Sequence, residues 1–156
     1  MLDADGSVIA TLSYMDDISA TVASLDALLP EKATHLTIPA GLCNYEGDRY
    51  SWGDGLVVGT APFHEPWTNV IVASGGPSVG GVSVGTPDGF GVGDPSSVLA
   101  AGISGATAED WGDATLGGTL IWYDLDANDR GVFAMADKLH GSIVSIIAPQ
   151  EQGSDC

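Results

Sequence analysis

Gly76-Pro77-Ser78-Val79-Gly80 has the form of a nucleophile elbow, the motif in which a serine attacks a carbonyl carbon. That chemistry needs a sharp turn from a strand into a helix, which lifts the serine over an oxyanion hole. Here residues 81–85 continue as another β segment, and a sequence with 22 glycines matches such patterns by chance. We therefore expect Ser78 to be a turn residue, and we predict no catalytic residue in the chain.

Asp124, Asp126 and Asn128 place oxygen-bearing side chains at alternating positions, as the first half of a calcium-binding loop does. An EF-hand loop also has glycine at its sixth position and glutamate at its twelfth, and this segment has neither. The sequence therefore favours a hairpin loop here. A calcium site is the weaker alternative, and no other cofactor is expected.

The remaining candidate sites have simpler structural explanations. His35, His64 and His140 are scattered and lack the spacing of metal ligands. The glycine run 89–93 before a helix could hold an anion, but no Lys or Arg lies near it and Asp94 would repel an anion. We interpret the run as a structural turn.

The charge of the chain limits its partners. It has 21 acidic and four basic residues, a net charge of −17, which repels nucleic acid and anionic lipid surfaces. No apolar run reaches the roughly 18 residues that a membrane helix needs, so membrane insertion is not expected. The acidity indicates solubility in a saline or extracellular setting, or else binding of cations or of a basic protein.

Two cysteines and two aromatic residues complete the list of candidate site residues. Cys43 and Cys156 are too far apart for a metal knuckle, and a disulfide between them would suit an oxidising compartment. A free thiol at Cys156 is the alternative. Tyr45 and Trp111 stand in acidic, loop-like surroundings, so we predict that they contact a partner, because exposed Tyr and Trp often anchor interfaces.

Helix signals appear twice in the sequence. Ser13 and Asp16 have the form of a capping box for a helix over Ser13–Pro30. Apolar residues at spacings of three and four predict one buried stripe on it: Met15, Ile18, Val22, Leu25 and Leu29. A shorter helix is expected over 96–101, with Asp94 as its cap and Gly102 at its end.

The rest of the chain favours strands, because runs of β-branched and aromatic residues alternate with Gly, Pro, Asp and Asn. The expected strands are Val8–Leu12, Leu36–Ile38, Tyr50–Val58, Trp67–Ala73, Gly81–Val84, Thr119–Leu125, Gly131–Met135 and Ser142–Ala148. Trp52 and Trp122, on two of these strands, are expected in the core. The predicted class is α+β, mainly antiparallel β with two helices.

The order of these elements repeats. An Asp-Gly pair, a short strand, a helix and an aromatic strand occur in residues 1–80 and again in 81–150, so each half is predicted as β-α-β-β-β. The spacing differs between the halves and requires loop insertions. We treat residues 1–156 as a single globular unit, with two tandem repeats as a hypothesis and 151–156 as a tail.

Residues Gly89 to Leu99 resemble the strand, turn and helix opening of secreted bacterial repeats, such as those of beta-lactamase inhibitor protein and of small outer-membrane assembly lipoproteins. In those families the helix packs on a short antiparallel sheet. The chain is also similar to secreted tandem-repeat proteins of unknown role from high-GC Gram-positive bacteria, through Cys43, the Tyr50-Ser51-Trp52 strand and Cys156. No functional residue is carried over from these families.

We therefore expect a secreted, non-enzymatic binding module that acts outside the cell or at its surface, with a basic protein as its partner. One alternative is a structural or calcium-dependent component of a surface layer or of a larger extracellular complex. Another is a small hydrolase whose site is assembled from distant residues.

Overall fold

The computed structural model of the chain describes residues 1–2, 5–40, 46–60, 69–112, 117–123, 130–137 and 139–151. Its helices are α1 (Ile18–Leu28) and α2 (Ser96–Gly102). Its strands are β1 (Thr34–Ile38), β2 (Gly47–Trp52), β3 (Leu56–Thr60), β4 (Asn69–Ser74), β5 (Ser78–Val79), β6 (Val82–Ser83), β7 (Thr107–Gly112), β8 (Gly117–Tyr123), β9 (Arg130–Asp137) and β10 (Ile143–Glu151). The predicted α+β class is confirmed.

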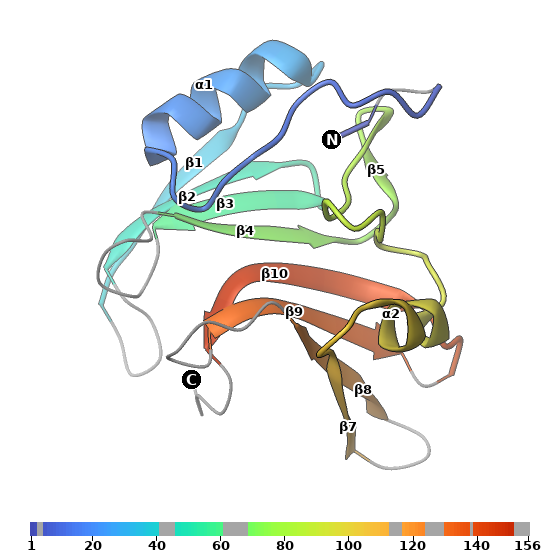
Figure 1. Cartoon of the computed structure of the whole chain (residues 1–156). Coiled ribbons are helices and arrows are strands. Elements are labelled where there is room, and N and C mark those ends of the chain that lie inside the picture. Colours follow the sequence, from blue (N-terminus) through green and yellow to red (C-terminus); the bar gives the residue numbers. More distant parts are fainter. Residues whose placement is uncertain are drawn as a thin grey trace.

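Eight strands form one antiparallel sheet in the order β1-β2-β3-β4-β10-β9-β8-β7, and β5 and β6 form a separate hairpin (Figure 1). Strands β1 to β4 follow α1 along the chain, and β7 to β10 follow α2. Each half therefore contributes a helix and then four strands. The strand expected before each helix is reduced to an isolated bridge, Leu2 with Val8 and Gly85 with Gly91. The internal duplication itself stays a prediction.

Both helices pack on the same face of the sheet. Ile71 and Ala73 are two residues apart in β4, so their side chains point to the same face. Ile71 packs with the cluster that contains Leu25 of α1, and Ala73 belongs to the cluster that contains Leu99 of α2. We call the face that carries Ile71 and Ala73 the helix face, and the face that carries Val72 the open face.

The apolar core lies on the helix face in two adjoining clusters. Around α1, Leu25 and Leu29 pack against Trp52, Leu56 and Val58 of β2 and β3. The cluster around α2 consists of Ala73, Val92, Leu99, Ile121, Tyr123, Val132, Ala134, Ile143 and Ile146. Val84 contacts both clusters and connects them.

The long helix begins five residues later than predicted. Asp17 is its N-cap, and its Oδ1 accepts the Ser19 and Ala20 N–H groups at 2.9 and 3.2 Å. The turn before it is bound to the sheet by Asn69, whose Nδ2 donates to the Ser13 and Asp16 carbonyls at 3.3 and 2.6 Å. Because these carbonyl groups accept hydrogen bonds from Asn69, they do not begin the hydrogen-bond series of a helix. Met15, expected in the buried stripe, is 47% exposed.

The short helix has nearly the predicted span but a different cap. Pro95 occupies the N-cap position and makes no side-chain capping bond. The predicted cap, Asp94, turns back instead, and its Oδ2 accepts the Gly91 N–H at 2.7 Å. Asp94 thus stabilises the preceding glycine turn, because the short Asp side chain can bond nearby backbone N–H groups.

Several strand predictions were wrong in detail. The run predicted as one strand over 50–58 is a hairpin, because Gly53, at a φ of 55°, turns the chain between β2 and β3. Residues 9–12 form no strand. Strand β7 was missed, because Glu109 and Asp110 disfavour a strand by composition. As an edge strand paired on one side with β8, it keeps both acids exposed.

Asp26, near the end of α1, joins the helix to the sheet. Its Oδ1 accepts the Ala33 N–H at 2.9 Å and the Trp52 indole N–H at 3.0 Å. These two bonds, together with the charge of Lys32, hold the pKa of Asp26 below its ordinary value. The carboxylate therefore remains ionised at neutral pH, where it is the form that accepts both bonds.

Asp26→Asn is expected to make the free energy of unfolding depend less on pH under acidic conditions. A lowered folded-state pKa contributes stability above the unfolded-state value, about 3.9, and that contribution is lost as pH falls through the folded pKa. Urea unfolding between neutral pH and pH 2.5 measures the effect. The difference in unfolding free energy between wild type and Asp26→Asn should shrink below about pH 4. A difference that does not change with pH would contradict this role.

Candidate binding surfaces

A row of apolar side chains crosses the open face. The register of the sheet aligns one residue from each of five neighbouring strands, β3, β4, β10, β9 and β8: Val57, Val72, Ile147, Phe133 and Trp122. We call this set the apolar row. With strands about 4.8 Å apart, the row is about 19 Å long.

The apolar row continues into polar residues at both edges of the sheet. Ser51 and Thr34 extend it through β2 and β1, and Thr107 extends it into β7. A second row on the same face runs through Ser145, Met135 and Leu120. The open face is thus apolar in its centre and polar at its margins, which is the composition of many protein interfaces.

The side chains of the apolar row differ in burial, and two of them form an aromatic pair. Val57, Val72, Ile147 and Phe133 are half-buried, whereas Trp122 is 7% exposed. The rings of Trp122 and Phe133 lie 4.4 Å apart between centroids and are tilted by 38°. This pair gives the row a rigid aromatic end on the second half of the chain.

The described segments outside the large sheet that pack against the core clusters all lie on the helix face. Residues Leu25 and Leu29 near the end of α1, Leu99 of α2, and Val79 and Val82 of the β5–β6 hairpin all belong to, or pack against, the two core clusters there. The apolar row therefore has no described helix over it. Side chains of this type that remain accessible on a folded chain are typical of a contact surface.

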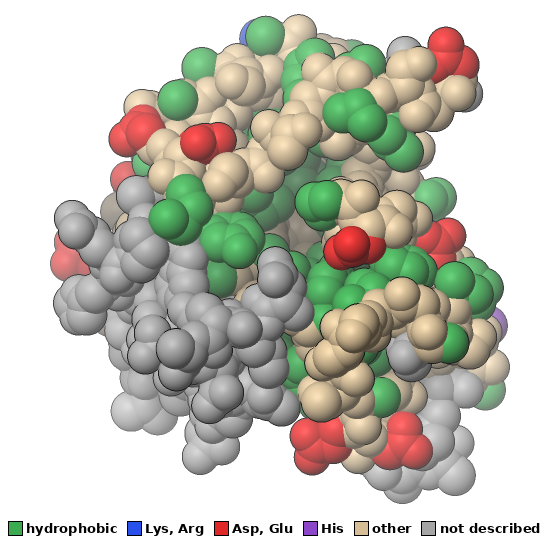
Figure 2. Space-filling model, in the orientation of Figure 1, with side chains coloured by type: hydrophobic (Ala, Val, Ile, Leu, Met, Phe, Trp, Pro, Cys, Tyr) green, Lys and Arg blue, Asp and Glu red, His purple; other side chains and the backbone are tan. Residues whose placement is uncertain are grey.

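The open face carries charged groups of both signs, because exposed Arg49 of β2 lies on it opposite Leu36, together with two acids. Glu109 in β7 pairs with Leu120 and is exposed. Asp137, at the end of β9, pairs with Gly118 and bonds to His140. The His140 bond and the Leu139 N–H hold the pKa of Asp137 below its ordinary value. The side of the molecule shown in Figure 2 exposes several Asp and Glu side chains and almost no Lys or Arg.

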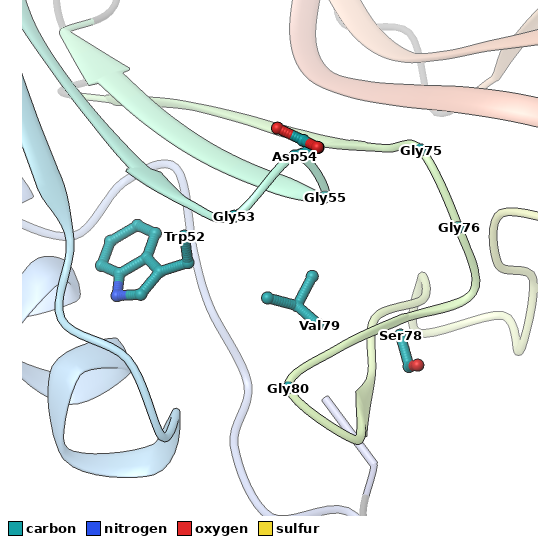
Figure 3. A pocket seen from close by; sticks show the side chains of 9 residues that line it. All are labelled: Trp52, Gly53, Asp54, Gly55, Gly75, Gly76, Ser78, Val79 and Gly80. Carbon is teal, nitrogen blue, oxygen red and sulfur yellow. The ribbon is translucent and has the colours of Figure 1, made fainter.

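A glycine-lined pocket of about 220 Å³ lies between the β2–β3 turn and the segment that leads to β5 (Figure 3). It is lined by Trp52, Gly53, Asp54, Gly55, Gly75, Gly76, Ser78, Val79 and Gly80. The walls need glycine: a Cβ at Gly75 would lie 2.9 Å from the Asp54 carbonyl oxygen. Ser78 belongs to a β hairpin and no helix follows it, as expected. Its hydroxyl and the Asp54 carboxylate do not point toward each other in Figure 3.

His35 on β1 forms a polar cluster with its neighbours. Its Nε2 lies 2.8 Å from Oδ1 of Asp48, and its ring stacks on Tyr50 at 4.6 Å. Thr37 donates its hydroxyl to the same Asp48 oxygen at 3.2 Å. The His35 bond is the main reason why the pKa of Asp48 is lowered. No local pattern in the sequence indicates this cluster, because the cross-strand register of β1 and β2 brings its residues together.

Most predicted site residues lie outside the described part of the chain. These are Cys43 and Cys156 of the predicted disulfide, Tyr45, and the calcium candidates Asp124, Asp126 and Asn128. Trp111 is described in its backbone only: it lies in edge strand β7 opposite Gly118 and not in a loop as predicted. Trp52 and Trp122 are both buried, as expected, but on opposite faces of the sheet.

Two further features are absent from the described residues. No three His, Cys, Asp or Glu side chains there come together as metal ligands. Neither described helix combines the length and the apolar composition needed to cross a membrane. Comparison of the chain with protein-family models, with curated proteins and with solved structures found no match.

Proposed function

We propose that this chain is an extracellular protein-binding module and that the open face contacts its partner. The observation that carries the proposal is the apolar row, which crosses five strands on the face opposite both helices. Half-buried Val, Ile and Phe side chains next to a tryptophan can supply the desolvated centre of an interface. The serine and acidic groups of the described residues offer no comparable support for catalysis.

The partner is a basic protein. A net charge of −17 attracts cationic surfaces over about one Debye length, roughly 8 Å at physiological salt. Glu109, which pairs with Leu120 two residues from Trp122, places part of that charge beside the aromatic end of the apolar row. Electrostatic attraction would then accelerate association, and the apolar row would slow dissociation.

Phe133→Ala is expected to weaken binding of a partner by about 1–3 kcal/mol, mainly through faster dissociation, because it removes an aromatic anchor. The partner is sought in the culture medium of the source organism and its binding is then measured by surface plasmon resonance. Leu139→Ala is the matched control, since Leu139 is apolar and 79% exposed but lies in the β9–β10 turn. Raising salt should slow association for all variants alike.

Capture of a protein alone does not support the proposal. If the partner dissociates from Phe133→Ala and from wild type at the same rate, the open face is not its contact surface. Trp111→Ala tests the other end of β7, four residues from the row position at Thr107, in the same assay. If only Trp111→Ala weakens binding, the contact is at the β7 edge and not at the apolar row.

A further inference from the structure

The large sheet ends in two edge strands, β1 and β7. Four consecutive residues of each, Thr34–Thr37 and Thr107–Asp110, are exposed. An edge strand presents backbone N–H and C=O groups on its free side that can pair with another strand. Folded proteins usually prevent such pairing with charged side chains, proline or bulges on the edge.

The two edges differ in this protection. Strand β7 carries Glu109 and Asp110 in the middle of the strand. Strand β1 has the sequence Thr-His-Leu-Thr-Ile, with no Asp, Glu, Lys, Arg or Pro. Its pairing with β2 runs over five residues without a register shift, so no bulge bends it away. Thus β1 is a regular, open edge, and β7 is protected by its charges.

The side chains around β1 define what a paired strand would meet. On the open face, Leu36 is 59% exposed and lies opposite Arg49 of β2, which is also exposed. On the helix face, Asp48 of β2 uses a single oxygen, Oδ1, for its bonds to His35 and Thr37, and its side chain is 46% exposed. One face of the edge therefore offers an apolar contact next to an arginine, and the other face offers a carboxylate.

We propose that β1 accepts an extended segment of a basic partner protein as an additional strand, with apolar side chains toward Leu36 and cationic side chains toward Asp48. An added strand would lie about 4.8 Å from β1 and about 10 Å from β2. Across that distance a Lys or Arg side chain can reach the Asp48 carboxylate. Two copies of this chain fit less well, because each carries −17.

The first test uses capped nine-residue peptides as probes for the full chain. A peptide of alternating valine and arginine should bind and should protect the amides of residues 34–38 from hydrogen exchange, without protecting 107–112. The same peptide with glutamate in place of arginine should bind at least about tenfold more weakly. In an added strand, alternate residues direct their N–H groups toward β1. Therefore, of two peptides N-methylated on the valines or on the arginines, only one should lose binding.

Variants of the edge provide the second test. Leu36→Lys should weaken binding of the valine-arginine peptide about tenfold, because it removes the apolar contact and adds a charge of the same sign as the peptide's. Asp48→Asn should weaken binding of the same peptide about two- to fivefold, which corresponds to the contribution of one exposed ion pair. Ala108→Lys on β7 is the matched control and should change binding less than twofold. Thermal melts confirm that each variant is folded.

Three results would overturn the proposal. The first is that the valine-arginine peptide does not bind at concentrations up to millimolar. The second is that both N-methylated peptides bind as tightly as the parent peptide. The third is that the protein alone self-associates, with concentration-dependent protection of residues 34–38 from hydrogen exchange. The last result would assign the edge to a second copy of this chain. None of the three bears on Phe133 in β9, so the open-face proposal is judged separately by Phe133→Ala.

Discussion

Leu25→Asp is expected to abolish the cooperative folded state. Leu25 is fully buried in α1, where it packs in one cluster with Leu29, Trp52 and Leu56. An unpaired carboxylate at this position would lose its hydration without gaining a hydrogen-bond partner, which costs several kcal/mol. The loss of the leucine packing adds about 2–5 kcal/mol. Together these costs approach the total stability of a typical domain, about 5–15 kcal/mol.

Near-ultraviolet circular dichroism and urea unfolding measure the effect of Leu25→Asp. Ala23→Asp is the matched control, because it places the same charge on an exposed position of the same helix. Its effect should stay within about 1 kcal/mol, since it changes helix propensity but buries nothing. If Leu25→Asp keeps the wild-type urea midpoint, α1 does not pack on the sheet as described.

Leu99→Ala is expected to reduce the free energy of unfolding by about 2–5 kcal/mol. Helix α2 has seven residues, too few to be stable without tertiary contacts. Leu99 supplies those contacts: it is fully buried in the cluster that contains Ile121, Tyr123 and Val132. Val98→Ala, at a neighbouring residue that is 52% exposed, should change stability by less than about 0.5 kcal/mol.

Leu99→Ala also tests whether the two halves unfold together. Strands β4 and β10 pair over four residues at the centre of the sheet, and Val84 contacts both core clusters. A single globular unit should therefore show one transition at a lower urea concentration, with the same midpoint by tryptophan fluorescence and by circular dichroism. Two separate transitions would show that the half containing α2 unfolds independently.

The sequence was sufficient for features that depend on local patterns. Apolar spacings of three and four residues predicted the long helix, and Leu25 and Leu29 of the predicted stripe are buried. Runs of β-branched and aromatic residues located most strands of the large sheet. These signals are readable because helix and strand periodicities are properties of consecutive residues.

Element boundaries depended on contacts between distant residues. The long helix begins at Ile18 because Asn69, far along the chain, binds the carbonyls of Ser13 and Asp16. Strand β7 forms in an acidic segment because β8 pairs with it. Neither contact leaves a pattern in the local sequence, so both boundaries were predicted incorrectly.

The candidate binding surfaces were decided by tertiary structure alone. Trp52 and Trp122 look equivalent in the sequence, yet Trp52 packs under α1 and Trp122 lies on the open face. Their faces differ because a shift of one residue in register reverses the side of the sheet to which a side chain points. The apolar row and the exposed β1 edge likewise arise from the pairing order of eight strands. By itself the sequence determined the α+β class and the acidic charge, and the register of the sheet determined which residues lie together on its surface.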